Sequence, residues 1–528
     1  MSKIAGIVAL CGLAFALAAC TTNVEETKAP GIPTAKVVGG EVEGVVADGL
    51  SVFKGIPFAA PPVGDLRWKA PQPVAPWEGV KKTVAFGNAC MQDMAMARSM
   101  GDKSEISEDC LYLNVWSPAA DAGDRLPVLV WIYGGGFSGG MTSVPMYDGE
   151  RLAKKGVVVV SIAYRVGPFG FLAHPELSAE SGQGSGAYGM ADMIHGLRWV
   201  KENVGQFGGD ASKVTIFGHS AGGMAVAILA ASPEAKGLFH GVISMSGGGF
   251  APLRTKDEPG TSIPTLKLAE GVGAAFLGKL GAQDIAAARA LDAQAIQDAI
   301  AGSGASFRPA ADGRIIPDSQ YLMYEAGDFN DTPILVGTTS DEAASFGARK
   351  ATPAEFSSQI KKGYGPAAKE ILAVYPHATD EDATRSLKQV SRDNTFGWGT
   401  WTWARLQTQK GRGKAFVYYY DHHAATAPDG AGHGTDVPYA FQTLTSAQGA
   451  APSAEDVALS DLISDYWVNF AKTGDPNVAD LPQWPAYDEG SPQVLTFGAT
   501  TGTVEPYPNM DKLQALDKYF TWLRGQAK

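Results

Sequence analysis

The chain has 528 residues, of which 45% are hydrophobic, and this is ample material for a large buried core. Its formal net charge is −12, and its lysines and arginines are scattered along the sequence rather than clustered. We therefore expect no nucleic-acid partner, because proteins that bind nucleic acids present a concentrated basic surface.

The first residues predict export from the cytoplasm. Lys3 precedes an apolar run, residues 4–17, that is too short and too rich in glycine and alanine to span a membrane. The run leads into Leu-Ala-Ala-Cys, ending at Cys20, which resembles a bacterial lipobox. A lipid-modified Cys20 would anchor the protein to a bacterial membrane in the cell envelope. A plain signal peptide with an Ala-x-Ala-like cleavage site is the alternative.

Export also permits disulfide formation, and the four cysteines leave one pair for it. Cys11 and Cys20 belong to the N-terminal segment, so Cys90 and Cys110 remain. A bond between them would close a loop of about 20 residues and stabilise the fold by on the order of 3 kcal/mol. Two free buried thiols are the alternative.

The elements expected further along the chain alternate between strands and helices. Residues 126–133 and 156–163 are continuous apolar runs, typical of strands buried on both faces of a parallel sheet. Alternating strands and helices indicate an α/β fold with a largely parallel, doubly wound sheet. The other expected strands are 214–217, 241–246, 332–337 and 414–420; the expected helices are 188–204, 225–231, 458–472 and 510–524; and 247–331 is a helical, alanine-rich, cap-like excursion.

No internal repeat or obvious linker divides the chain beyond its N-terminal segment. We therefore predict a lipoprotein-type signal peptide at residues 1–19, a polar tether at 20–36 and one large domain at 37–528.

The strand at 214–217 runs directly into Gly-His-Ser-Ala-Gly, residues 218–222, and then into a helix of small apolar residues. This is the G-x-S-x-G pattern in the context of a sharp strand-to-helix turn, which presents a nucleophilic serine at the carboxyl end of a sheet. Ser220 is the candidate nucleophile. The amide of Ala221, at the start of the helix, is a candidate donor to an oxyanion.

Hydrolysis with a serine nucleophile needs further oxyanion donors, a base and an acid. A glycine run, residues 134–136, follows the strand at 126–133 and can offer amides without interfering side chains. Two adjacent carboxylates, Asp341 and Glu342, follow a later strand. Four histidines follow these acids, and the glycine-rich loop around His433 favours it as the base over His377, His422 and His423.

Several motifs, in one order, resemble the type-B carboxylesterases, the family of bacterial p-nitrobenzyl and fumonisin esterases, mammalian carboxylesterases and cholinesterases. The resemblance runs from Gly39 to the C-terminal helix. The motifs that carry it are Gly-Ile-Pro-Phe (55–58) with its continuation to residue 68, Glu-Asp-Cys-Leu-Tyr-Leu-Asn-Val (108–115), Tyr-Arg-Val-Gly-Pro-Phe-Gly-Phe-Leu (164–172), the nucleophile signature (207–222) and His-Gly-Thr-Asp-Val-Pro-Tyr-Ala-Phe (433–441).

The resemblance implies an α/β-hydrolase fold and a serine carboxylester hydrolase that acts on small-molecule esters and needs neither a metal nor a cofactor. It implies Ser220 as nucleophile, Glu342 rather than Asp341 as acid, and His433 as base. It also implies that Gly135, Gly136 and Ala221 form the oxyanion hole, that Cys90 and Cys110 form a disulfide, and that Arg67–Glu108 and Arg165–Asp192 are structural ion pairs.

Three departures from the family pattern limit the substrate. Ala343 replaces a glycine after the acid, and His219 replaces the glutamate that often precedes the nucleophile; we interpret His219 as a pocket-side residue. The segment between Cys90 and Cys110 contains no aromatic residue, whereas cholinesterases place a tryptophan there for cation–π binding, so choline esters are disfavoured. An amidase or acylglycerol lipase on the same residues is the alternative. A non-catalytic adhesion or binding protein of the same fold is more remote, because all three candidates are present.

Overall fold

The computed structural model describes residues 33–526, with gaps at residues 100, 257–261, 347–348, 425–426, 428, 445–450 and 499–501. The predicted signal peptide, Cys20 and most of the tether lie outside the described residues. Within the described ranges, no helix has both the length and the apolar character needed to cross a membrane.

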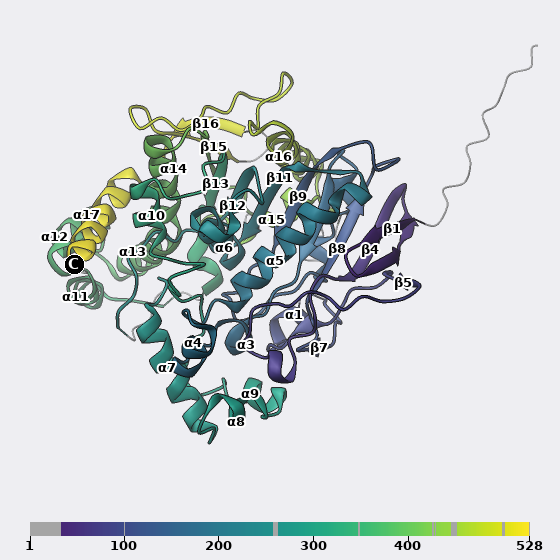
Figure 1. Cartoon of the computed structure of the whole chain (residues 1–528). Coiled ribbons are helices and arrows are strands. Elements are labelled where there is room, and N and C mark those ends of the chain that lie inside the picture. The colour runs from purple at the N-terminus through teal and green to yellow at the C-terminus, as the bar shows by residue number, and fades with distance from the viewer. Residues whose placement is uncertain are drawn as a thin grey trace, which may run out of the picture. The chain divides into compact units, whose positions relative to one another are not determined.

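A large mixed β-sheet forms the centre of the fold, and eleven strands of the described residues build it (Figure 1). In spatial order they are β16 (Gly502–Pro506), β15 (Gln493–Phe497), β14 (Ala415–Tyr420), β13 (Ile334–Thr339), β12 (Gly241–Met245), β11 (Gly209–His219), β9 (Leu126–Ile132), β10 (Val158–Ile162), β8 (Tyr112–Ser117), β4 (Leu50–Pro57) and β3 (Val45–Ala47). Neighbours from β15 to β10 are parallel, and the pairs toward both edges are antiparallel. The sheet is therefore largely parallel, as predicted.

The central strands are the apolar runs seen in the sequence. Every residue of β10 and all but the first of β9 are buried, as expected where helices cover both faces of a parallel sheet. β11 is longer than predicted, because it begins at Gly209 and its pairing with β9 contains a register shift before Val214. Smaller sheets are formed by β1 (Thr34–Val37), β2 (Gly40–Glu43) and β5 (Val80–Lys82), and by β6 (Ala89–Cys90) with β7 (Ile106–Ser107).

Helices cover both faces of the sheet. α6 (Ala221–Ala231) and α16 (Ala454–Thr473) each contact β9, β11 and β12. α5 (Tyr188–Asn203), α10 (Gln320–Ala326) and α14 (Trp398–Lys410) share the layer of α6 (Figure 1). The other helices are α1 (Ala95–Ser99), α2 (Glu150–Ala153), α3 (Gly167–Phe171), α4 (Pro175–Ser181), α11 (Pro353–Gly363), α12 (Ala368–Val374), α13 (Asp380–Arg392), α15 (Val437–Phe441) and α17 (Met510–Gln526).

The excursion predicted at 247–331 is helical, as expected. It contains α7 (Leu266–Lys279), α8 (Ile285–Arg289) and α9 (Ala293–Asp298), which lie together at the bottom of the view in Figure 1, and then α10. The helices between β13 and β14 were not predicted; this segment holds α11 to α14 with a π-helical turn at Asp393–Gly397. Both segments contribute to the cavity described next.

Candidate active site

Ser220 occupies a single-residue turn between β11 and α6. Its φ of +58° and ψ of −123° lie in a region that costs a residue with a side chain on the order of 1–3 kcal/mol. Its amide donates to Met245 O at 2.9 Å, which fixes the turn against β12. A Cβ on Gly222 would lie 2.7 Å from Tyr133 O, so a side chain there would collide with the end of the neighbouring strand. Glycine at this position therefore allows α6 to begin immediately after the turn at Ser220.

The glycine run after β9 lies directly beside this turn. A Cβ on Gly134 would come within 3.0 Å of Ser220 Cβ. Gly135 and Gly136 have φ of +119° and +65°, values that glycine adopts without strain. Together with Ala221, the first residue of α6, these glycines line the same cavity as Ser220. The predicted oxyanion donors are therefore brought together next to the candidate nucleophile.

The loop after β13 is tied to the loop that carries His433. Ser340 Oγ accepts a hydrogen bond from Ala431 N at 2.8 Å, and Asp341 N donates to Ala431 O at 2.8 Å. These bonds hold Glu342 opposite His433, although 91 residues separate the two.

Glu342 is fully buried and uses both carboxylate oxygens. Oε1 accepts from Thr339 N at 2.8 Å, and Oε2 lies 2.5 Å from His433 Nδ1. The neighbouring acid points elsewhere, because Asp341 Oδ2 forms an ion pair with Lys388 Nζ at 2.8 Å. Lys388 is a partner of Asp341 that the sequence did not predict. Of the two adjacent acids, Glu342 is the one in contact with His433.

A cavity of about 1040 Å³ opens above these residues, and Ser220 and His433 both line it. This volume is at the upper end of the range for small-molecule sites. Rings surround His433: the ring centroids of Phe396 and Phe346 lie 4.7 and 5.2 Å from its own. His219 lines the cavity as predicted, with its ring centroid 4.5 Å from that of His433.

Burial sets the charge of the groups around the histidine. Burial, together with the nearby His433, lowers the pKa of His219 well below its ordinary value, so the His219 ring is neutral at neutral pH. Burial raises the pKa of Asp436 from 3.8 to about 6, although a hydrogen bond donated by the Tyr418 hydroxyl at 2.8 Å opposes the rise. Asp436 is a buried acid near the site whose environment the sequence did not predict.

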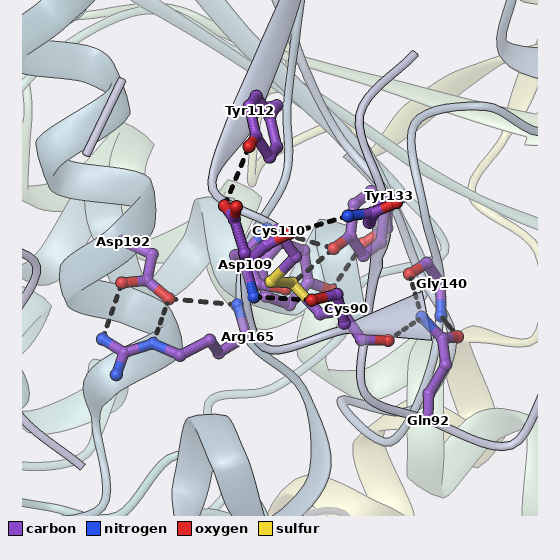
Figure 2. The surroundings of a disulfide bond; sticks show 12 residues. Cys90, Gln92, Asp109, Cys110, Tyr112, Tyr133, Gly140, Arg165 and Asp192 are labelled. Atoms are coloured by element: carbon purple, nitrogen blue, oxygen red, sulfur yellow. Dashed lines mark hydrogen bonds and ion pairs between the residues drawn. A yellow bond between two sulfur atoms is a disulfide. The ribbon is translucent and has the colours of Figure 1, made fainter. Parts of the chain in front are cut away.

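The predicted scaffold features are present, and Figure 2 shows the disulfide together with the Arg165–Asp192 ion pair. Cys90 and Cys110 form a disulfide, as predicted. The adjacent Gln92 accepts from Gly140 N at 2.7 Å and donates to Gly140 O at 2.9 Å, which ties the disulfide segment to the loop that follows the glycine run. The ion pairs Arg67–Glu108 and Arg165–Asp192 both form, with shortest distances of 2.6 and 2.8 Å.

The sequence does not identify the individual residues that the helical segments contribute to the cavity walls. Arg392, Thr395 and Phe396 reach the cavity from the end of α13 and the π-helical turn, and Arg308 reaches it from the excursion. No local pattern distinguishes these residues, because their position depends on how distant segments pack. Among the described residues, no cluster of three or more histidines, cysteines or acids could hold a metal ion.

Comparisons with known proteins agree with this architecture. The family model described as the carboxylesterase family matches residues 29–516. The chain belongs to the carboxylesterase family. The curated relatives reported below are named esterases, and this chain is accordingly a carboxylic ester hydrolase with the predicted α/β-hydrolase fold.

Curated relatives and solved structures match nearly the whole of this carboxylesterase-family chain. It is 37% identical to fumonisin B1 esterase of Sphingopyxis macrogoltabida over 484 residues, 88% of this chain and 86% of that protein. It is 34% identical to para-nitrobenzyl esterase of Bacillus subtilis (strain 168) over 493 residues, 90% and 97% of the two chains. A solved PNB esterase superposes with a TM-score of 0.80 at 33% identity, covering 92% of this chain and 99% of that one. A thermophilic PNB esterase gives a TM-score of 0.81 at 32% identity, covering 92% and 100%.

Proposed function

We propose that this carboxylesterase hydrolyses small-molecule esters through an acyl-enzyme on Ser220, with His433 as base and Glu342 as the acid that orients it. The observation that carries the proposal is the 2.5 Å contact between Glu342 Oε2 and His433 Nδ1, made beside a cavity that Ser220 also lines. A buried carboxylate in this position fixes the histidine tautomer and stabilises the imidazolium.

In the first half of the reaction, Ser220 Oγ attacks the ester carbonyl carbon and its proton passes to His433 Nε2. The carbonyl oxygen becomes an oxyanion, and the amides of Gly135, Gly136 and Ala221 stabilise it. Collapse of this intermediate breaks the bond to the alcohol oxygen, which leaves with the proton from His433. The acyl group stays on Ser220.

In the second half, His433 takes a proton from water, and the resulting hydroxide attacks the acyl carbon. The second tetrahedral intermediate collapses, the carboxylic acid leaves, and Ser220 Oγ regains its proton from His433. Throughout the reaction, Glu342 accepts the hydrogen bond from His433 Nδ1–H and takes no proton from it.

The test replaces Ser220 by alanine and measures hydrolysis of p-nitrophenyl esters. We expect turnover to fall by orders of magnitude with an unchanged melting curve, because the nucleophile is lost and a smaller side chain fits the turn. Ser358→Ala, at an exposed position of α11, is the matched control and should remain active. Residual Ser220→Ala turnover above a few per cent of wild type would contradict the assignment.

The names of the relatives guide the choice of substrates. Fumonisin B1 esterase and para-nitrobenzyl esterase are named for esters of small molecules, and we propose substrates of this class here. A chain-length series of p-nitrophenyl esters beside a p-nitroanilide separates an esterase from a lipase or an amidase. Faster cleavage of the anilide than of the matched ester would favour the amidase.

The proposal extends to the N-terminus and to the domain division. Residues 37–528 act as the catalytic domain, and Cys20 carries the lipid that holds it at a membrane in the cell envelope. Cys20→Ser should move the enzyme out of the membrane fraction or leave the precursor uncleaved, whereas Cys11→Ser, within the signal segment, should change neither. A mature N-terminus at any residue other than Cys20 would contradict the lipid anchor.

A further inference from the structure

Arg308 is a cation in the cavity wall that the proposed reaction does not use. It lines the same cavity as Ser220 and His433, and it also lines a smaller recess that adjoins it. Met224 is common to both spaces, and its amide donates to Ser220 O at 2.8 Å. Phe137, which follows the glycine run, forms another wall of the recess. Arg308 is thus placed where a bound ester would pass.

The described part of the chain provides no counter-charge for this guanidinium. Its Nε is buried and has no hydrogen-bond partner among the described residues. Burial lowers the pKa of Arg308, and the one charge that adds to this effect is another cation, Arg254. An arginine nevertheless stays protonated in proteins, so a full positive charge remains in the wall.

A second arginine of the cavity shows what a structural role looks like. Arg392 Nε donates to Asp393 Oδ1 at 2.7 Å, and its NH1 donates to Ser340 O at 2.9 Å. Its charge is neutralised, and its bonds hold the loop that carries Glu342. Arg308 has no comparable acid among the described residues, although desolvating a cation is costly unless it is paired.

We propose that Arg308 is the centre of an anion subsite in this cavity and that the preferred ester carries a carboxylate in addition to the ester group that is cleaved. The apolar walls of the recess strengthen the attraction, and a guanidinium can bind a carboxylate through two parallel hydrogen bonds. The proposal rests on the proposed function, since it assigns a substrate class to the same site. The carboxylate can belong to the acid or to the alcohol part of the ester.

The experiment compares matched charged and neutral esters on wild type and on Arg308→Gln. For the acid part, mono-p-nitrophenyl succinate is paired with p-nitrophenyl butyrate, and for the alcohol part, 4-acetoxybenzoate with phenyl acetate. In Arg308→Gln, we expect the ratio of kcat/KM for the charged ester to kcat/KM for its neutral partner to fall by about 10–100-fold in one of the two pairs. The pair that responds shows whether the carboxylate belongs to the acid or to the alcohol part of the ester. The same ratio for Arg308→Lys should lie between those of wild type and Arg308→Gln, because lysine keeps the positive charge but cannot bind a carboxylate through two parallel hydrogen bonds.

Arg314→Gln is the matched control, because Arg314 is an exposed arginine paired with Glu234 at 3.1 Å, and it should change neither ratio. Competitive inhibition of the wild type by succinate compared with succinamide tests the subsite without any variant, and succinate should inhibit more strongly. The proposed subsite would be contradicted if the kcat/KM ratios of Arg308→Gln stayed within threefold of wild type in both ester pairs. Equal inhibition of the wild type by succinate and succinamide would also contradict it. Such a result would leave the Ser220 dependence of turnover intact, whereas turnover by Ser220→Ala would overturn the proposed function itself.

Discussion

Two buried carboxylates, Asp192 and Glu342, each have a basic side chain as partner but lie in different surroundings. Asp192 accepts from Arg165 N, Nε and NH2 at 2.8–3.0 Å, and the same guanidinium donates to Lys69 O. These hydrogen bonds hold α5, which carries Asp192, against segments that precede it in the chain. Glu342 is equally buried, but its partner His433 lines the cavity beside Ser220. Burial of a paired carboxylate therefore does not by itself mark a candidate catalytic residue, and the feature that separates the two pairs is a partner that lines the cavity beside Ser220.

Breaking the Glu342–His433 pair should give the largest effect. Glu342→Gln keeps the shape of the side chain and its bond from Thr339 N but removes the charge that stabilises the imidazolium. We expect kcat to fall by about 10³–10⁴, measured with a p-nitrophenyl ester.

The adjacent acid provides the control for this substitution. Asp341→Asn breaks the ion pair with Lys388 and should leave activity within about tenfold of wild type while lowering stability more than rate. The opposite ranking, on proteins with matched melting curves, would transfer the role of the acid to Asp341.

Breaking the Arg165–Asp192 pair should change stability rather than rate. Asp192→Asn leaves the Arg165 guanidinium buried without its carboxylate, so we expect the free energy of unfolding to fall by about 3–5 kcal/mol in urea titrations. The kcat of the folded variant should stay within about threefold of wild type.

An exposed pair gives the scale for this prediction. Glu381→Gln removes a salt bridge to Arg385 in which the Glu381 side chain is 84% exposed, and it should cost about 0.5 kcal/mol or less. A loss of kcat in Asp192→Asn at unchanged stability would remove the distinction between the two buried pairs.

Asp436 is a third buried acid, and it differs from Asp192 and Glu342 because its hydrogen-bond donor is a neutral group, the Tyr418 hydroxyl. Its pKa is raised by burial from 3.8 to about 6, so the folded protein holds this proton more tightly than the unfolded chain does. This group's contribution to stability is therefore lost as the pH rises from about 4 to about 6. Asp436→Asn removes this loss of stability. The difference in melting temperature between Asp436→Asn and wild type should therefore increase between pH 4 and pH 6 and stay constant at higher pH. The corresponding gain in the free energy of unfolding is up to about 3 kcal/mol. A difference that is independent of pH between 4 and 7 would contradict the raised pKa.

The parts of the molecule that were predictable from sequence are those with local signals. The turn at Ser220 is one of them, because a β-branched strand, two glycines and a small apolar helix occur within twenty residues. The central strands are another, since strands buried on both faces are continuous apolar runs. Glu342 and His433 are far apart in sequence, and the choice of Glu342 over Asp341 came from the family resemblance rather than from the residues alone.

The parts that could not be predicted depend on packing between distant segments. The antiparallel edge strands β3 and β16 are short and contain no buried residue, so they lack the continuous apolar pattern of the central strands. Lys388 meets Asp341 only because α13 packs against the loop after β13. Arg308 is the same kind of case, since nothing near it in the sequence indicates which residues of the excursion line the cavity.

The most direct test of the account is covalent labelling of the candidate nucleophile. The full-length protein is treated with an organophosphonate ester, and the adduct is measured by intact-mass spectrometry and located by peptide mapping. We predict one adduct, on the peptide that contains Ser220, formed rapidly in wild type, far more slowly in Glu342→Gln, and not at all in Ser220→Ala. An adduct on any other residue, or labelling of Ser220→Ala at the wild-type rate, would contradict the assignment of Ser220, His433 and Glu342 as the catalytic residues.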